Sequence, residues 1–147
     1  MNLTSKIFYN KKILIYGMGI TGFSSYNYLK KNNQIFLYDD NKKILKKNYL
    51  RKLFLDISKV RKIKFDYIVI SPGINVNICS LKNYLKKYSK KIVTDLDIFY
   101  SLYSKNKIIT ITGTNGKSTT AKLLNTILKN HRKDARLCGN IGNPVLL

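Results

Sequence analysis

Short apolar runs rich in β-branched residues alternate along the chain with segments whose apolar residues recur every three or four positions. The short runs predict strands, and the longer recurrence predicts amphipathic helices. The predicted strands are 13–16, 35–38, 67–70, 92–93 and 108–111, with shorter candidates at 54–55 and 137–138. The predicted helices include 20–29, 81–88, 96–103 and 117–130. This alternation is typical of an α/β fold with a parallel sheet.

The helix after the fourth predicted strand has a clear start signal. Thr94 and Asp97 stand three residues apart in the form [ST]-x-x-[DE], which is that of a capping box. The apolar residues expected on one face of this helix are Leu96, Phe99, Leu102 and Tyr103. The polar stretch 104–107 that follows is the best candidate for a boundary between domains.

A first glycine motif directly follows the first predicted strand. Residues 17–22 read G-M-G-I-T-G, which fits G-x-G-x-x-G at the start of a helix. The glycines permit a tight turn, and the helix N-terminus offers N–H groups to a phosphate. Asp39 ends the next predicted strand, where an acid of a dinucleotide-binding protein binds a ribose hydroxyl. The motif is compatible with binding of NAD, with binding of another nucleotide diphosphate, or with a purely structural turn. The adjacent Asp40 is compatible with a solvated turn residue.

A second glycine loop is the strongest chemical signal. Residues 113–119 read G-T-N-G-K-S-T before the last predicted helix. The N–H groups of such a loop wrap the β- and γ-phosphates, Lys117 supplies positive charge, and Ser118 supplies a hydroxyl to Mg²⁺. The usual pattern G-x-x-x-x-G-K-[ST] requires glycine at position 111, where the chain has Ile111, so the loop is a shortened form. The alternative is a chance Gly-Lys-Ser.

Two weaker loops follow other predicted strands. Ser71 and Gly73 flank a proline at the expected carboxyl edge of the sheet, where ligands bind, although the same sequence suits an ordinary turn. Residues 139–144 read G-N-I-G-N-P, in which Asn140 either contacts a polar ligand or occupies a left-handed loop position.

The charge of +21 on 147 residues would suggest a nucleic acid or an anionic membrane as partner. However, Lys, Asn, Ile and Tyr together make up 70 of the 147 residues, and A/T-rich codons encode all four. Compositional drift is therefore the simpler explanation, and a selected polyanion surface is the alternative. The lysines are spread over most of the predicted helices, so we expect no specific nucleic-acid partner.

Several classes of protein are excluded by the chain's composition. The longest nearly apolar run, 13–23, is shorter than the roughly 20 residues of a membrane span, and no signal peptide is readable. Only two cysteines occur, far apart and without histidine at ligand spacing, so neither a disulfide framework nor a zinc site is expected. These features fit a protein of the reducing cytoplasm.

The motifs in this order resemble the Mur ligases, the ATP-dependent amide-bond-forming enzymes of peptidoglycan precursor synthesis. The resemblance covers the whole chain, and it is strongest to the D-glutamate-adding branch. The sequences that carry it are GMGITG at 17–22, SPGI at 71–74, DLDIF at 95–99, ITGTNGKSTT at 111–120 and GNIGNP at 139–144. The shortened phosphate loop is that family's own form.

The resemblance implies a Rossmann-like domain over 1–93 that binds the UDP part of the substrate rather than NAD. It also implies that 94–147 is the truncated start of a central P-loop ATPase-type α/β domain. The implied substrate residues are Gly17, Gly19, Ile20, Thr21, Gly22, Asp39, Asp40, Ser71, Gly73 and Asn140. The implied ATP residues are Gly113, Thr114, Asn115, Gly116, Lys117, Ser118 and Thr119, with Lys117 catalytic and Ser118 a ligand of Mg²⁺.

The implied reaction joins D-glutamate to UDP-N-acetylmuramoyl-L-alanine through an acyl phosphate, with ATP and Mg²⁺, in cell wall synthesis. The chain departs from the family at Cys138, where glycine is usual, and lacks an Arg after Asp39. The D-glutamate site is expected beyond Leu147, so this chain alone is expected to be inactive and to need the rest of the ligase. The alternatives are a stand-alone nucleotide-sugar or dinucleotide-binding module without catalysis and a basic nucleic-acid-binding protein.

Overall fold

The structure is a computed structural model that describes residues 7–47, 50–139 and 143–146. The chain divides into two compact units. The first unit runs to Ser104 and also includes Leu146, and the second runs from Lys105 to Val145. Among the described residues, no helix is long and apolar enough to cross a membrane.

A four-stranded sheet with the order β2-β1-β3-β4 forms the centre of the first unit. The strands are β1 (Lys12–Tyr16), β2 (Gln34–Tyr38), β3 (Tyr67–Ile70) and β4 (Ile92–Val93). All the pairings are parallel, and Tyr16 lies beside both Tyr38 and Ile70, so the carboxyl ends of three strands meet at one edge. The four strands predicted within the first 93 residues are confirmed, and so is the Rossmann-like α/β class.

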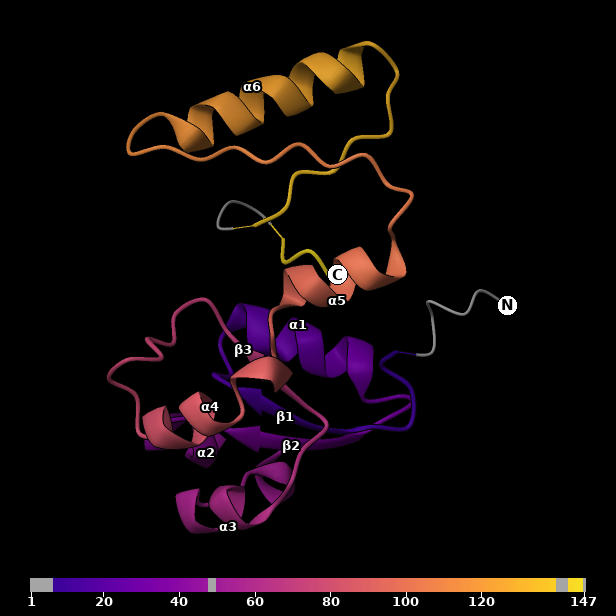
Figure 1. Ribbon diagram of the computed structural model, residues 1–147. Coiled ribbons are helices and arrows are strands. Elements are labelled where there is room, and N and C mark those ends of the chain that lie inside the picture. Colours follow the sequence, from indigo (N-terminus) through magenta and orange to yellow (C-terminus); the bar gives the residue numbers. More distant parts are fainter. Residues whose placement is uncertain (1–6, 48–49, 140–142, 147) are drawn as a thin grey trace. The chain divides into compact units, whose positions relative to one another are not determined.

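Helices connect these strands because two parallel neighbours cannot be joined by a hairpin. The helices of the first unit are α1 (Ile20–Leu29), α2 (Lys42–Lys47), α3 (Ile57–Lys62), α4 (Lys82–Lys87) and α5 (Asp95–Leu102), with short 3₁₀ turns at Arg51–Leu53 and Ser89–Lys91. Figure 1 shows α1 on one side of the sheet and α3 on the other. Both faces of the sheet are therefore covered, as the continuous apolar strands require.

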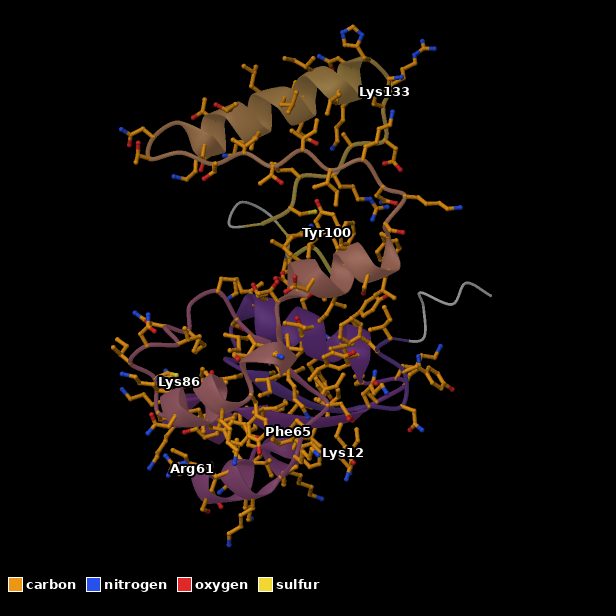
Figure 2. The ribbon with its side chains drawn as sticks, viewed as in Figure 1. Lys12, Arg61, Phe65, Lys86, Tyr100 and Lys133 are labelled. Atoms are coloured by element: carbon orange, nitrogen blue, oxygen red, sulfur yellow. The ribbon has the colours of Figure 1, made fainter. Side chains whose placement is uncertain are left out.

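One core cluster lies between the sheet and the helices α3 and α4. It joins Leu14 of β1 to Val60 of α3 and to Phe65, which is almost completely buried. Figure 2 shows Phe65 within this layer, whereas the charged side chains of Arg61 and Lys86 project away from it. The lysine-rich helices thus keep their charges in water and present only their apolar side to the sheet.

The capping box predicted at the start of α5 is present. The backbone N–H of Thr94 donates to Asp97 Oδ2 at 2.7 Å, and the N–H of Asp97 donates to Thr94 Oγ1 at 3.3 Å. The expected apolar face of this helix was partly wrong, because Leu96 is 54% exposed and Ile98 is fully buried. Leu96 lies in the first turn of the helix and is exposed, whereas Ile98 is the apolar residue of this helix that is buried.

Helix α5 packs within the first unit. It contacts β4, and Tyr103 at its end is hydrogen-bonded to Tyr28 of α1. Burial, together with this hydrogen bond, raises the pKa of Tyr28 to about 12. The resemblance to the family implies a domain boundary after Val93. The division into compact units follows Ser104 instead, so the two do not coincide. The domain boundaries stay a prediction.

The predicted strand 108–111 and the two shorter candidates, 54–55 and 137–138, do not form in the described residues. Phe54 makes only an isolated parallel bridge with Leu37, at the outer side of β2. Cys138 makes only an isolated bridge with Asn143, and residues 108–111 have no regular structure. A strand is stabilised by hydrogen bonds to its neighbours. The apolar run 108–111 has no paired strand among the described residues, and so its strand propensity is not realised.

The second unit contains the helix predicted after the second glycine loop, α6 (Lys117–Asn130). Its apolar residues fall on one side, as the spacing predicts, but none of its residues is buried. Leu123 is 60% exposed and Ile127 is 46% exposed. The described residues of this unit therefore form a helix and its loops without a packed core.

Candidate functional site

The first glycine loop turns at the carboxyl edge of the sheet, between β1 and α1. Gly17 has a φ of +91°, which favours glycine, and its N–H donates to Tyr38 O at 2.9 Å. A Cβ on Gly22 would lie 1.9 Å from the carbonyl oxygen of Gly17, so the turn and the helix touch backbone to backbone. A Cβ on Gly19 would meet nothing within 4 Å. Thus the fold explains Gly17 and Gly22, whereas the backbone at Gly19 is open to a ligand.

Asp39 holds this loop through its backbone. Its Oδ2 accepts a hydrogen bond from the N–H of Met18 at 2.7 Å, and its Oδ1 accepts one from the N–H of Asn41 at 2.8 Å. The carboxylate is half-buried. Asp39 is thus brought next to the glycine loop, as the motif predicts, and it shapes the loop as well as offering lone pairs to a ligand.

Asp40 is exposed, as a solvated turn residue would be, but it also lies at the centre of a group of hydroxyls. Its Oδ2 accepts a hydrogen bond from Tyr16 OH at 2.5 Å, and its Oδ1 accepts one from Tyr38 OH at 3.4 Å and another from Ser80 Oγ. Tyr38 OH and Ser80 Oγ are also 2.8 Å apart. These four residues are called the Asp40 cluster below.

Protonation states in the Asp40 cluster follow from burial and hydrogen bonding. Burial raises the pKa of Tyr16 and of Tyr38, which therefore stay protonated donors at neutral pH. Burial alone would raise the pKa of Asp40, but the hydrogen bonds from Ser80, Tyr16 and Tyr38 outweigh it and lower that pKa. The carboxylate is thus charged and accepts hydrogen bonds from donors that do not ionise.

Ser71 joins the end of β3 to the glycine loop. Its N–H donates to Tyr16 O at 3.0 Å, and its hydroxyl donates to Gly17 O at 2.6 Å. The chain then turns through Pro72 and Gly73, with the N–H of Ile74 donating to Ser71 O at 3.0 Å. Gly73 is exposed. The turn at 71–73 is therefore tied to the first glycine motif through the Ser71 hydroxyl.

The N-terminus of α1 opens at the same edge. Ile20 is 78% exposed and Thr21 is half-buried. No acidic residue lies in the first turn, so the N–H groups there face no neighbouring carboxylate of the helix itself. An α-helix N-terminus of this kind favours a phosphate or another anion.

The second glycine loop lies in the second unit. Gly113 and Gly116 have positive φ values of +145° and +72°, and α6 begins directly after Gly116. The ammonium group of Lys117 donates to the carbonyl oxygens of Gly113 and Thr114, the latter at 3.2 Å. The lysine is thus folded over its own loop, next to the exposed N-terminus of a helix of 14 residues.

The donor set of this loop fits a nucleotide phosphate and a metal bound to it. Lys117 is the only charged group of the loop, and Ser118 and Thr119 are exposed in the first turn of the helix. Among the described residues no group of three or more His, Cys, Asp or Glu could hold a metal by itself. A divalent cation here would therefore depend on the hydroxyl of Ser118 and on oxygens of the nucleotide.

The structure brings most of the predicted substrate residues to one edge of the sheet: Gly17, Gly19, Ile20, Thr21, Gly22, Asp39, Asp40, Ser71 and Gly73. The predicted ATP residues, 113–119, belong to the other unit. Asn140 lies outside the described residues. Tyr16, Tyr38 and Ser80 were missed, although tyrosines in register at the ends of two paired strands, followed by an acid, are visible in the sequence.

Comparisons with known proteins agree with this arrangement. The family model described as Mur ligase MurD-like, N-terminal domain, matches residues 11–93. The UDP-N-acetylmuramoylalanine–D-glutamate ligase of Rickettsia prowazekii is 37% identical over 139 residues, which is 92% of this chain and 31% of that protein. The enzyme of the same name from Lachnoclostridium phytofermentans is 35% identical over 147 residues, covering 93% of this chain and 32% of that protein.

The ligase of that name from Wolbachia pipientis is 32% identical over 142 residues, covering 93% of this chain and 28% of that protein. The chain therefore spans about a third of the length of the curated relatives that it matches. The family match includes the whole sheet from β1 to β4 and the edge at which the first glycine loop, Asp39 and Ser71 meet. This chain belongs to the Mur ligase family, and within it to the MurD-like members.

Proposed function

We propose that the chain is the N-terminal part of an ATP-dependent ligase that adds D-glutamate to UDP-N-acetylmuramoyl-L-alanine in peptidoglycan precursor synthesis. One observation carries the proposal: the likeness to ligases of this name covers 92% of the 147 residues. A stretch of that length necessarily includes both glycine loops, 17–22 and 113–119. A family likeness limited to the first sheet would support a nucleotide-binding module only.

The edge of the sheet in the first unit is the proposed site of the UDP-muramoyl substrate. The N–H groups at the start of α1, near Ile20 and Thr21, would receive the diphosphate, because an anion is stabilised there. Asp39 would hold the uracil or ribose end with the lone pairs that Met18 and Asn41 leave free. Ser71, Gly73 and, from outside the described residues, Asn140 complete the proposed set.

The loop 113–119 is the proposed site of ATP. Lys117 would exchange its two carbonyl partners for phosphate oxygens and so reduce the repulsion between the γ-phosphate and an attacking carboxylate. Ser118 would give a hydroxyl to Mg²⁺, which neutralises charge on the phosphates when it is bound. These residues place and neutralise the reacting groups, while the chemistry belongs to the substrates.

The proposed reaction has two steps. A carboxylate oxygen of UDP-N-acetylmuramoyl-L-alanine attacks the γ-phosphorus of ATP, and the bond to ADP breaks to give an acyl phosphate. The amine of D-glutamate then attacks the acyl carbon, an amide bond forms, and inorganic phosphate leaves with the bonding electron pair. We place this activity in the cytoplasm, since the free thiols of Cys79 and Cys138 fit a reducing compartment.

The test uses the intact protein that contains this chain. Lys117→Ala is expected to reduce ATP-dependent joining of D-glutamate by at least about a hundredfold, as the loss of a transition-state electrostatic contact does. Its affinity for UDP-N-acetylmuramoyl-L-alanine is expected to be unchanged. Phosphate release measures the first quantity, and calorimetry measures the second.

Lys122→Ala is the matched control, because Lys122 is an exposed lysine of the same helix, outside the loop. It is expected to leave the ligation rate unchanged. Ligation by Lys117→Ala at the unsubstituted rate would contradict the proposed ATP site. A protein that binds NADH tightly and no UDP compound would favour the alternative of a dinucleotide-binding module.

A further inference from the structure

The Asp40 cluster joins three parts of the chain that are distant in sequence. Tyr16 ends β1, Tyr38 ends β2, and Ser80 belongs to the long connection between β3 and α4. The two tyrosine rings pack edge to face with their centroids 5.2 Å apart, which directs both hydroxyls to the same place beyond the strands. Asp40 is thus the charged group to which the hydroxyls of these three residues donate.

The connection 71–81 is fastened at both of its ends. At the first end, Ser71 donates to Gly17 O, and the side chain of Ile74 lies against Gly17. At the other end, Ser80 donates to Asp40, and Leu81 is buried in the core cluster. Between these ends the backbone hydrogen bonds are local, Cys79 packs against the core cluster, and Ile78 is 81% exposed.

Asp40 and Leu81 restrain this connection in different ways. Burial of Leu81 fixes how closely α4 approaches the sheet. It does not fix where the preceding residues lie along the edge, because apolar packing is not directional. Hydrogen bonds are directional, and those from Ser80 and Tyr38 to one carboxylate set the position of Ser80 over the end of β2.

We propose that Asp40 is a positioning residue of the substrate site: through Ser80 it holds the connection 71–81 against the carboxyl edge of the sheet, beside the glycine loop. This inference rests on the proposed function and adds to it a role for Asp40 that acts through another residue. With its carboxylate engaged by Tyr16, Tyr38 and Ser80, Asp40 shapes one wall of the site.

The charge of Asp40, and not only its shape, is required for this role. A carboxylate has two acceptor oxygens with about four lone-pair positions, which is enough for three hydroxyl donors. Asparagine keeps the shape but offers one oxygen, and its NH₂ group would face donors. Two other groups act on the cluster. The Cys79 thiol is hydrogen-bonded to Tyr16, and the charge of Arg61 acts electrostatically on Tyr38.

The experiment compares Asp40→Asn and Ser80→Ala in the intact protein with the unsubstituted protein. Hydrogen exchange of the backbone amides of 74–80 is measured without ligand, and the dissociation constant for UDP-N-acetylmuramoyl-L-alanine is measured by calorimetry. Both variants are expected to exchange faster in this segment and to bind about tenfold more weakly, which is the loss of one charge-assisted hydrogen bond. Ser80→Ala removes only a hydroxyl and so tests the tie even if Asp40→Asn folds poorly.

Asp66→Asn is the control, because Asp66 is another aspartate that accepts a hydrogen bond from a distant part of the chain, here from the N–H of Lys12 at 2.8 Å, at the start of β1. It is expected to change neither quantity. Asp40→Glu, which keeps the charge, is expected to recover part of the affinity. Unchanged exchange in both test variants would overturn the inference, and so would faster exchange with unchanged affinity. If the unsubstituted protein binds no UDP compound, the proposed function fails, and the exchange data still report whether Asp40 fastens the segment.

Discussion

At the scale of single residues, two glycines of one motif have different reasons to be present. Gly22 meets the carbonyl oxygen of Gly17, so the protein's own packing excludes a side chain there. Gly19 has open space around it. The motif alone could not separate these cases, because both positions are equally part of G-x-G-x-x-G. The separation is useful, since Gly19 can be changed to test ligand binding while Gly22 cannot.

This difference predicts opposite outcomes for two alanine variants. Gly22→Ala is expected to lower the free energy of unfolding by about 1–3 kcal/mol, because overpacking outweighs the gain of about 0.5–1 kcal/mol from alanine in a helix. Gly19→Ala is expected to leave the free energy of unfolding unchanged and to weaken binding of the UDP ligand. Thermal unfolding followed by circular dichroism measures the first effect. Equal melting temperatures for both variants would contradict the close contact at Gly22.

At the scale of elements, the strands and most helices were predictable, whereas the faces of the helices were less so. Strands β1 and β3 are short and apolar, and few other structures suit such runs. Helix α5 has apolar residues on more than one side, and its packing within the first unit buries Ile98 rather than Leu96. The run 108–111 has the composition of a strand but does not form one, because strand propensity alone does not supply a paired neighbour.

The start of α5 contains two acids with opposite effects on stability. Asp95 is buried, which raises its pKa although the N–H groups of Leu96 and Asp95 partly oppose this; the nearby Asp97 raises it further. An acid whose pKa is raised by folding binds its proton more tightly in the folded state. Its contribution therefore makes the protein less stable as the pH rises from the unfolded pKa, near 3.8, through the folded one.

Asp95→Asn is accordingly expected to raise the free energy of unfolding at pH 7, and the gain is expected to vanish below the unfolded pKa. Asp97→Ala is the comparison variant in the same turn. It removes the oxygen that accepts from the N–H and the hydroxyl of Thr94, and it is expected to cost about 0.5–2 kcal/mol. Urea unfolding at several pH values measures both. A gain from Asp95→Asn that did not change with pH would contradict the proposed cause.

At the scale of the whole molecule, the net charge of +21 determines non-specific behaviour. The only ion pair that the structure shows in its described residues joins Lys59 and Asp56 at 3.6 Å, and both side chains are well exposed. Most lysines thus face water without an acidic partner nearby. Such a surface attracts any polyanion by releasing its counterions, whatever the sequence of the polyanion.

Affinity for single-stranded DNA is therefore expected to fall by at least about tenfold between about 50 mM and about 200 mM salt. Affinity for the UDP ligand is expected to change much less, because few charges contact it. Fluorescence anisotropy with labelled DNA measures the first quantity, and calorimetry measures the second. A saturable DNA complex that resists salt would instead support a selected nucleic-acid surface.

Local patterns in the sequence are enough to predict the parallel α/β sheet, the two glycine loops and the family. These patterns are apolar runs, glycines at fixed spacing and a lysine before a hydroxyl. The contacts of Asp40 and Ser71 could be seen only in the folded chain, because their partners lie far away in sequence. The register of β1 against β2 and β3 brings those partners to one edge of the sheet. No property of a single segment encodes such a meeting of separate strands.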